Sequence, residues 1–215
     1  MDGLQCNTVG QQQNCSCAGG SATGKQTCGS DHLFGACDCN SVKRVFATSA
    51  TFSGNLMTAG GATDGLTGAD TLCTQAAKGA NLGGSGSWKA WLSLQALDAK
   101  RRIADVGPWY LVDGQTKVFN NAAGLTATPL VPITMSEQGM SLIGSSGGSS
   151  VWTGTDNGGV TSPVGNCSGW TSTGGTSSLY GRIGDALSTQ GWTQSTGGQM
   201  LLPCTQNARL YCFEQ

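Results

Sequence analysis

The chain has 215 residues, of which only 11% are charged, and it carries a formal net charge of -1. This near-neutral balance excludes the basic surface typical of a nucleic-acid-binding protein, and no apolar run approaches the ~18 residues of a membrane-spanning helix. Six Trp, five Phe and three Tyr supply material for a core. We therefore expect a folded protein, rich in loops because of its 35 glycines.

Six of the ten cysteines fall at the start of the chain, in two copies of the spacing C-x8-C-x-C. They are Cys6, Cys15 and Cys17, followed by Cys28, Cys37 and Cys39. Structural zinc sites usually show C-x2-4-C spacing, so we predict that these six cysteines form disulfides among themselves. Their connectivity is left open, and metal binding or redox chemistry are the alternatives.

About 40 residues with few aliphatic side chains cannot bury enough apolar surface to fold unaided. We therefore predict a small disulfide-rich spacer module over residues 1–40 and a second domain over residues 41–215. An even cysteine count with low charge indicates an oxidising compartment. We expect the mature part of a secreted or outer-membrane, cell-surface protein, with a lipid anchor upstream of Met1 as one means of attachment.

The second part begins with Val45-Phe46-Ala47, which predicts a short strand. The strongest helix signal follows. Thr67 and Asp70 fit the capping-box spacing, and Gly79 is a stop signal. An apolar stripe at helical spacing consists of Ala69, Leu72, Cys73, Ala76, Ala77 and Ala80.

The remaining segments are short and separated by turn residues. Asp113-Gly114 lies between two apolar runs, which predicts a hairpin, and residues 99–105 are compatible with a second short helix. We expect strands within 88–93, 108–120, 130–135, 151–154 and 208–214. Long loops over 141–150 and 154–178 complete an α+β domain.

Several runs of this part, in the same order, resemble the endostatin domain of collagen. They are "GLTGADTLCTQAAKGANLGGSGSWKAWLS", "VWTGTDNGG", "CSGWTS", "SLYGRIGDA", "LPC" and "ARLYCFE". The resemblance spans roughly residues 42–214 and implies a C-type-lectin-like fold with long loops. It also implies two nested disulfides, Cys73–Cys212 and Cys167–Cys204.

The Gly/Ser/Thr-rich composition is similar to bacterial endostatin-like outer-membrane lipoproteins, and the first module resembles short cysteine-rich modules of secreted bacterial proteins. This implies a non-enzymatic, adhesin-like protein that binds a host, prey or extracellular-matrix protein or a glycan. The triplets of calcium-dependent lectins are absent, and "GWTS" stands where Trp-Asn-Asp would fall. The only histidine, His32, lies in the other module, so we expect no catalytic metal and no cofactor.

Candidate binding residues come from three places. Lys100, Arg101 and Arg102 form the only basic cluster, which is either a solvated helix face or a site for an anionic glycan. Trp192 lies in a polar stretch, where it either packs a loop or meets a ligand as an exposed aromatic. Asp156-Asn157 predicts a turn, with a structural calcium ion as the alternative.

We expect the recognition surface on the loops 141–178 and 188–203. Of the two tryptophans at the start of the 88–93 strand, Trp91 is predicted to face the core and Trp88 to be partly exposed.

The run "GSSGG" at 144–148 has the G-x-S-x-G spacing of serine hydrolases, but this domain has no histidine to act as a base. We predict no catalytic residues. Two other functions stay open, namely a structural subunit of a surface fibre or envelope, and a carbohydrate-active hydrolase with converging carboxylates.

Overall fold

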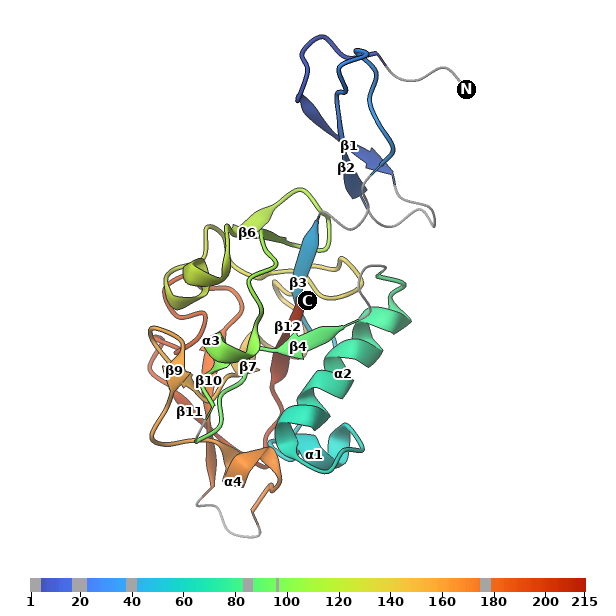
Figure 1. Cartoon of the computed structure of the whole chain (residues 1–215). Helices are drawn as coiled ribbons and strands as arrows, with labels where there is room; N and C mark the ends of the chain where they lie inside the picture. Colours follow the sequence, from blue (N-terminus) through green and yellow to red (C-terminus); the bar gives the residue numbers. More distant parts are fainter. Residues whose placement is uncertain (1–4, 17–22, 38–41, 83–86, 96, 175–178) are drawn as a thin grey trace.

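The computed structural model describes residues 5–16, 23–37, 42–82, 87–95, 97–174 and 179–215 (Figure 1). They form a mixed α+β structure with more strands than helices. The predicted boundary after residue 40 falls in the stretch 38–41, which lies outside the described residues. No helix in the described ranges is long and apolar enough to cross a membrane.

The described residues of the first module contain two antiparallel strands, β1 (Gln12–Ser16) and β2 (Thr23–Thr27), and two disulfides. Cys6 bonds to Cys28 and Cys15 bonds to Cys37, each across 22 residues of sequence. Each of these cysteines therefore pairs with its counterpart in the other copy of the C-x8-C-x-C repeat. Cys17 and Cys39, the remaining predicted partners, lie outside the described residues.

Among the described side chains of this module, only those of Cys6 and Cys28 are buried. Leu33 is 37% exposed and Val9 is 55% exposed, so neither contributes to a core. Cross-links take the place of a core in this module, which agrees with its size.

The large sheet of the second part has eight strands, with β12 (Arg209–Glu214) at its centre. Along the sheet the order is β11-β10-β7-β12-β3-β5-β6, and β4 also pairs with β12. β12 runs antiparallel to β3 and β4 but parallel to β7. The other strands are β3 (Lys43–Ala47), β4 (Trp88–Ala90), β5 (Trp109–Tyr110), β6 (Lys117–Phe119), β7 (Ser150–Trp152), β10 (Tyr180–Asp185) and β11 (Leu201–Pro203).

All six residues of β12 are buried, including both charged ends, because the strand lies at the centre of the sheet. Arg44 of β3 pairs with Glu214 at 3.0 Å, which satisfies the buried carboxylate at the end of β12. The pairing of β3 with β12 brings the start and the end of this domain side by side (Figure 1).

The longest helix, α2 (Gly65–Gly79), lies where the apolar stripe predicts it. Its cap differs from the prediction, because Asp64 and not Thr67 is the N-cap residue. The Asp64 carboxylate accepts a hydrogen bond from the Thr67 N–H at 2.8 Å, as N-cap side chains do. The short helical elements are α1 (Leu56–Ala59), α3 (Ala99–Arg102), η1 (Ala122–Thr126) and α4 (Cys167–Trp170).

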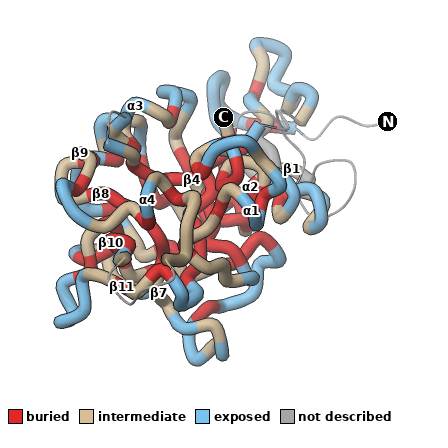
Figure 2. The backbone as a smooth tube through the Cα atoms, turned by 90° about the horizontal axis from the view of Figure 1, so that it is seen from below, coloured by how far each residue is buried: buried red, intermediate tan, exposed pale blue. Residues whose placement is uncertain are grey.

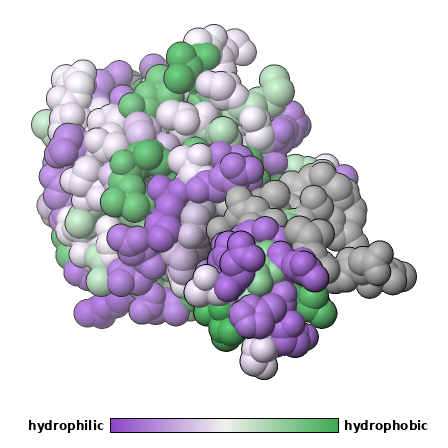
Figure 3. Space-filling view, turned by 90° about the horizontal axis from the view of Figure 1, so that it is seen from above, coloured by the Kyte–Doolittle hydropathy of each residue, from purple (hydrophilic) through white to green (hydrophobic). Residues whose placement is uncertain are grey.

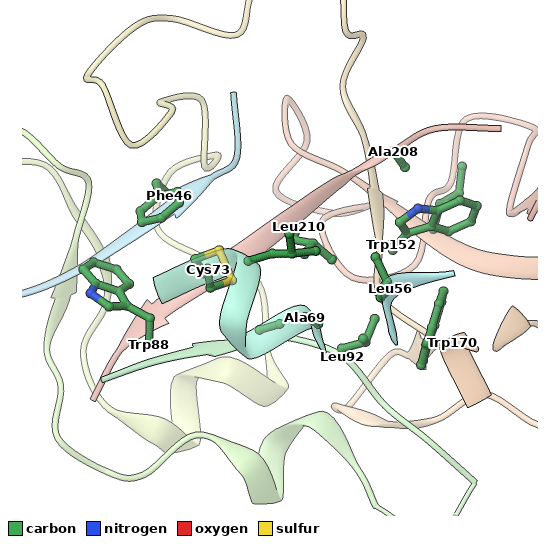
Figure 4. Packing of buried hydrophobic residues seen from close by; sticks show 14 of the residues in the cluster. Phe46, Leu56, Ala69, Cys73, Trp88, Leu92, Trp152, Trp170, Ala208 and Leu210 are labelled. Carbon is green, nitrogen blue, oxygen red and sulfur yellow. A yellow bond between two sulfur atoms is a disulfide. The ribbon is translucent and has the colours of Figure 1, made fainter. Parts of the chain in front are cut away.

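Two hydrophobic clusters pack against the two faces of the sheet. The first packs beneath α2 and includes Phe46, Cys73 and Leu210 (Figure 4). The second includes Trp91, Phe213 and other aromatic residues of the strands and loops. The buried stretches run through the middle of the domain, and the exposed ones lie on the outer loops (Figure 2).

This arrangement corrects the prediction that Trp88 is partly exposed. Trp88 is only 3% exposed and packs on Phe46 with ring centroids 5.0 Å apart. Trp91 belongs to the second cluster. Both side chains are buried because both faces of the sheet are covered at this strand.

The domain contains the disulfides Cys73–Cys212 and Cys167–Cys204, which are the pairs that the resemblance implies. The second bond lies within the sequence interval closed by the first, so the two are nested. Cys73–Cys212 fastens α2 to β12 across 139 residues. In the chain-entropy model, the disulfide that closes a loop of this length stabilises the fold by about 5 kcal/mol.

Some predicted elements are wrong. No strand covers 130–135, where only Met135 forms an isolated bridge, with Ser141. The predicted loop 141–150 has no helix or strand before β7 begins at its last residue, whereas the predicted loop 154–178 contains β8 (Thr155–Asp156), β9 (Val160–Thr161) and α4. The Asp113-Gly114 hairpin is present as β5 paired antiparallel with β6.

Candidate binding site at the turn between β8 and β9

The hairpin of β8 and β9 turns through Asn157-Gly158-Gly159. Gly158 and Gly159 have φ values of +83° and +73°, which glycine adopts without steric cost. A Cβ at Gly159 would also lie 3.2 Å from the Trp91 ring. The turn therefore packs closely onto the second cluster.

α3 and the loop before it hold this hairpin in place. The Asp98 carboxylate accepts hydrogen bonds from the Thr161 N–H at 2.8 Å and from its hydroxyl at 3.1 Å. The bond from the Thr161 N–H is the main cause that lowers the pKa of Asp98. Lys100 donates to the carbonyl of Gly158 at 3.3 Å. These contacts fix the turn against α3.

Asp156 has a structural partner. Its carboxylate lies 2.8 Å from Nη2 of Arg182, a residue of β10 that is only 8% exposed. Arg182 also donates from Nε to the Ser162 hydroxyl at 3.2 Å. Through its ion pair with Arg182, Asp156 anchors the hairpin to the sheet. Within the described ranges, no group of three His, Cys, Asp or Glu side chains is placed to hold a metal ion.

A cavity of about 190 Å³ opens beside the turn. Three separate segments form its wall, namely the end of η1, the β8–β9 turn and the loop after β10. The lining residues are Leu125, Thr126, Ala127, Thr128, Asn157, Gly158, Gln190, Trp192 and Thr193. We call this the Asn157 cavity.

The backbone of the Asn157 cavity is well anchored. The Asn157 N–H donates to the side-chain oxygen of Gln194 at 3.1 Å, and Trp192 Nε1 donates to the Ala127 carbonyl at 3.0 Å. The Thr193 hydroxyl accepts from Trp91 Nε1 at 2.8 Å. The first two of these bonds connect the three segments, and the third ties the loop after β10 to the core.

Four polar residues of this wall are exposed; the Thr126 hydroxyl donates to the Ala123 carbonyl at 2.8 Å, and the other three are Asn157, Gln190 and Thr128. Among the described residues, none of these three makes a side-chain hydrogen bond. They offer two amide groups and a hydroxyl, with no net charge. Such groups both donate and accept hydrogen bonds, so the cavity suits an uncharged ligand rich in hydroxyls.

Trp192 is not an exposed binding residue, which corrects one of the two expectations for it. It is 2% exposed, and its ring centroid lies 4.8 Å from that of Trp91 and 5.1 Å from that of Phe119. Its neighbours in sequence are polar, and the one aromatic side chain anchors the loop in the core. Trp192 is one of the residues that form the cavity wall.

The basic cluster does not act as a unit. Arg102 is a buried structural residue, since its side chain is 5% exposed, lies 2.7 Å from Asp70 and donates to the carbonyls of Ala90 and Leu92. Arg101 is 71% exposed and lies 3.8 Å from Asp98. Lys100 reaches the β8–β9 turn. The three side chains thus point to different surroundings, and a shared anion site is wrong for Arg102.

The structure brings together Lys100, Asn157 and Trp192 of the predicted site residues. Gln190 and Thr193 lie in the predicted loop 188–203. Thr126, at the end of η1, and Thr128 were not predicted; both are ordinary polar residues about 30 positions before the turn. No local pattern marks them, and only the tertiary fold places them beside Asn157.

The sequence matches no protein-family model, and no curated protein matches it either.

Proposed function

We propose that this chain is a non-enzymatic extracellular binding protein with a C-type-lectin-like, endostatin-like domain, and that it binds a neutral glycan through the Asn157 cavity. One observation carries the proposal. Two exposed side-chain amides and a hydroxyl converge on a small cavity whose floor is the buried Trp192. Sugar hydroxyls both donate and accept hydrogen bonds, as these groups do.

Several features support the lectin-like architecture. The first and last strands of the domain pair with one another, and the one long helix among the described residues packs beside them. Of the two nested disulfides, Cys73–Cys212 fastens that helix to the last strand, and Cys167–Cys204 lies within the interval that it closes. Three described segments outside this frame build the cavity. Variation in such loops leaves the stapled scaffold intact, and this is where binding residues commonly lie.

The size of the cavity suits one sugar ring inserted from a longer glycan. A site this small gives weak affinity by itself, and repeated epitopes on a surface would raise the avidity. Apolar residues form separate patches among polar ones on the face seen in Figure 3. This surface favours polar recognition over a large apolar interface.

Four disulfides among the described residues indicate an oxidising compartment. We place the protein at the surface of a bacterial cell or in its secretions, where the disulfide-rich module serves as a spacer for the binding domain. A lipid anchor upstream of Met1 would attach it to an outer membrane.

The test is a glycan array probed with the full chain at micromolar concentration, in the absence of calcium. We expect binding to one group of neutral glycans, lost in Asn157→Ala and Gln190→Ala. The matched control is Gln75→Ala, which removes an exposed amide from α2. An array without signal, or binding that survives both cavity variants, contradicts the proposal.

A panel of extracellular-matrix proteins separates glycan from protein recognition. If the chain binds a matrix glycoprotein, enzymatic removal of its glycans abolishes binding under the proposal. Binding that persists after deglycosylation identifies a protein epitope and refutes recognition through a sugar.

A further inference from the structure

A second cavity, of about 450 Å³, lies near the start of β12, and Arg209 is the one charged residue among the described residues that line it. We call it the Arg209 cavity. It lies between the segment after β3 and the loop before β7. Serine residues predominate in its wall, among them Ser49, Ser136, Ser145 and Ser146, and Met140 and Leu142 add an apolar side.

The Arg209 guanidinium is buried, with the residue only 2% exposed. It donates to the carbonyls of Gly148 at 2.8 Å, Thr48 at 2.6 Å and Ser49 at 2.7 Å, and to the Ser145 hydroxyl at 2.8 Å. All four acceptors are neutral. The guanidinium has five N–H groups, and the second N–H of Nη2 has no acceptor in the described part of the chain.

Arg209 forms no ion pair with a carboxylate among the described residues. Glu137 is the nearby anion, but its carboxylate binds the N–H and the hydroxyl of Ser49 and lines a different cavity. Burial lowers the pKa of Arg209, and the charge of Glu137 offsets this only in part. The buried cation is therefore incompletely compensated, which is energetically costly.

Gly147 packs closely against Nη2 of Arg209 at the cavity wall. A Cβ at this position would lie 2.4 Å from Nη2, so any side chain would overlap the guanidinium. Gly147 and Ser145 belong to the "GSSGG" run, which has the G-x-S-x-G spacing of serine hydrolases. In this structure both residues contact the guanidinium of Arg209. The run packs around a buried cation that belongs to the cavity lining.

We propose that the Arg209 cavity binds an organic carboxylate, one oxygen of which accepts a hydrogen bond from Nη2 of Arg209. Bonds from a charged donor to a charged acceptor are the stronger ones, and the ligand supplies the negative charge that Arg209 lacks. Met140, which is 64% exposed, contacts the apolar body of the ligand. The C-terminal residue of a peptide has this combination of carboxylate and apolar side chain.

The test is an NMR titration of the ¹⁵N-labelled full chain with N-acetyl-leucine and with N-acetyl-leucinamide. For a ligand this small we expect a dissociation constant of roughly 1 mM for the acid, with shifts of the Gly147 and Arg209 signals. The amide should bind at least about tenfold more weakly, because it lacks the charge. Methyl glucuronide tests the other source of a carboxylate, an acidic sugar.

Arg209→Lys alone is a poor test because Arg209 also holds three backbone carbonyls. We therefore use Ser146, which is exposed and lines the cavity. Ser146→Trp should fill the cavity and abolish the shifts, while Ser146→Ala should retain them, with the same melting temperature in both variants. Asn157→Ala should leave them unchanged, which separates this site from the glycan site.

Equal binding of acid and amide, or no binding of either carboxylate at about ten times the expected dissociation constant, overturns the proposal. Shifts with methyl glucuronide and none with N-acetyl-leucine support a carboxylate site and identify an acidic sugar as its source.

Discussion

Asp70 and Arg102 join α2 to α3 through an ion pair of 2.7 Å. The same carboxylate accepts from the Ala90 N–H at 2.9 Å and lies 2.7 Å from Nζ of Lys89. One side chain on the long helix thus binds both the short helix and the strand β4. The basic triplet is divided at this point, since Arg102 turns inward and its neighbour Arg101 turns outward.

Removing the Asp70 charge should destabilise the fold strongly. Asp70→Ala leaves the buried Arg102 without its anion, and breaking a buried pair costs about 3 kcal/mol or more. Urea unfolding of the wild type and of Asp70→Ala measures the difference in their free energies of unfolding. Arg101→Ala is the matched control, because its exposed pair should contribute less than about 1 kcal/mol. Equal losses in the two variants would contradict a structural role for Asp70.

The two nested disulfides should differ in their contribution to stability. Cys73→Ser/Cys212→Ser opens a loop of 139 residues and should cost about 5 kcal/mol, while Cys167→Ser/Cys204→Ser opens one of 37 and should cost about 4 kcal/mol. Guanidinium unfolding of the two double variants provides the comparison. A larger loss on removing the inner bond would show that native-state strain or packing outweighs chain entropy.

In the first module, each cysteine should be bonded to its counterpart in the other copy of the repeat. Mass spectrometry of the non-reduced chain should find Cys6 linked to Cys28 and Cys15 linked to Cys37. The same spacing of 22 residues separates Cys17 from Cys39, so the repeat predicts that these two are also linked. Free thiols or bound zinc in this module would refute a disulfide-held spacer.

The backbone elements with a local signal were predictable from the sequence. The apolar stripe of α2 and the aromatic run of β12 both contain enough consecutive information to define an element. The cap of α2 was not predicted correctly, because Thr67 and Asp64 both fit cap chemistry. The geometry selects Asp64, whose carboxylate reaches the Thr67 N–H. Asp70 is instead recruited by tertiary contacts.

The candidate site was predictable only in part. Asn157 and Trp192 each carry a local signal in the sequence. Asp156-Asn157 predicts a turn, and Trp192 is an aromatic residue in a polar stretch. Their partners Thr128 and Gln190 carry no such signal, and loop packing alone places them in one cavity. Trp88 was expected to be partly exposed, and exposure was one of the two alternatives for Trp192, because the pattern of a single strand or loop cannot show that a second layer covers it.

Trp192 should behave as a core residue in mutagenesis. Trp192→Ala removes ring contacts with Trp91, Phe119 and Tyr211 and should destabilise the domain by about 3–5 kcal/mol. Trp192→Phe retains much of the volume and should cost less. Thermal unfolding followed by near-UV circular dichroism records both effects. If Trp192→Ala unfolds at the wild-type temperature, the side chain is not part of the core.

Acid should loosen the β8–β9 hairpin through Asp98. The hydrogen bond from the Thr161 N–H lowers the pKa of Asp98 in the folded state, whereas the unfolded chain has a pKa of about 3.9. A carboxylate with a depressed folded pKa stabilises the fold above the unfolded value, and this contribution is lost as pH falls through the folded pKa. Asp64, the cap of α2, has a lowered pKa for a similar reason, the bond from the Thr67 N–H.

Asp98→Asn distinguishes the effect of Asp98 from that of Asp64, because it removes the titratable carboxyl group of Asp98 and leaves that of Asp64. The variant should lose stability less steeply than the wild type below about pH 4, and its glycan binding should no longer weaken there, because Asp98 supports the turn that carries Asn157. Unfolding free energies and array signals at matched pH values test both points. If the wild type and the variant show the same acid dependence, the hairpin is held by contacts other than the Asp98 charge.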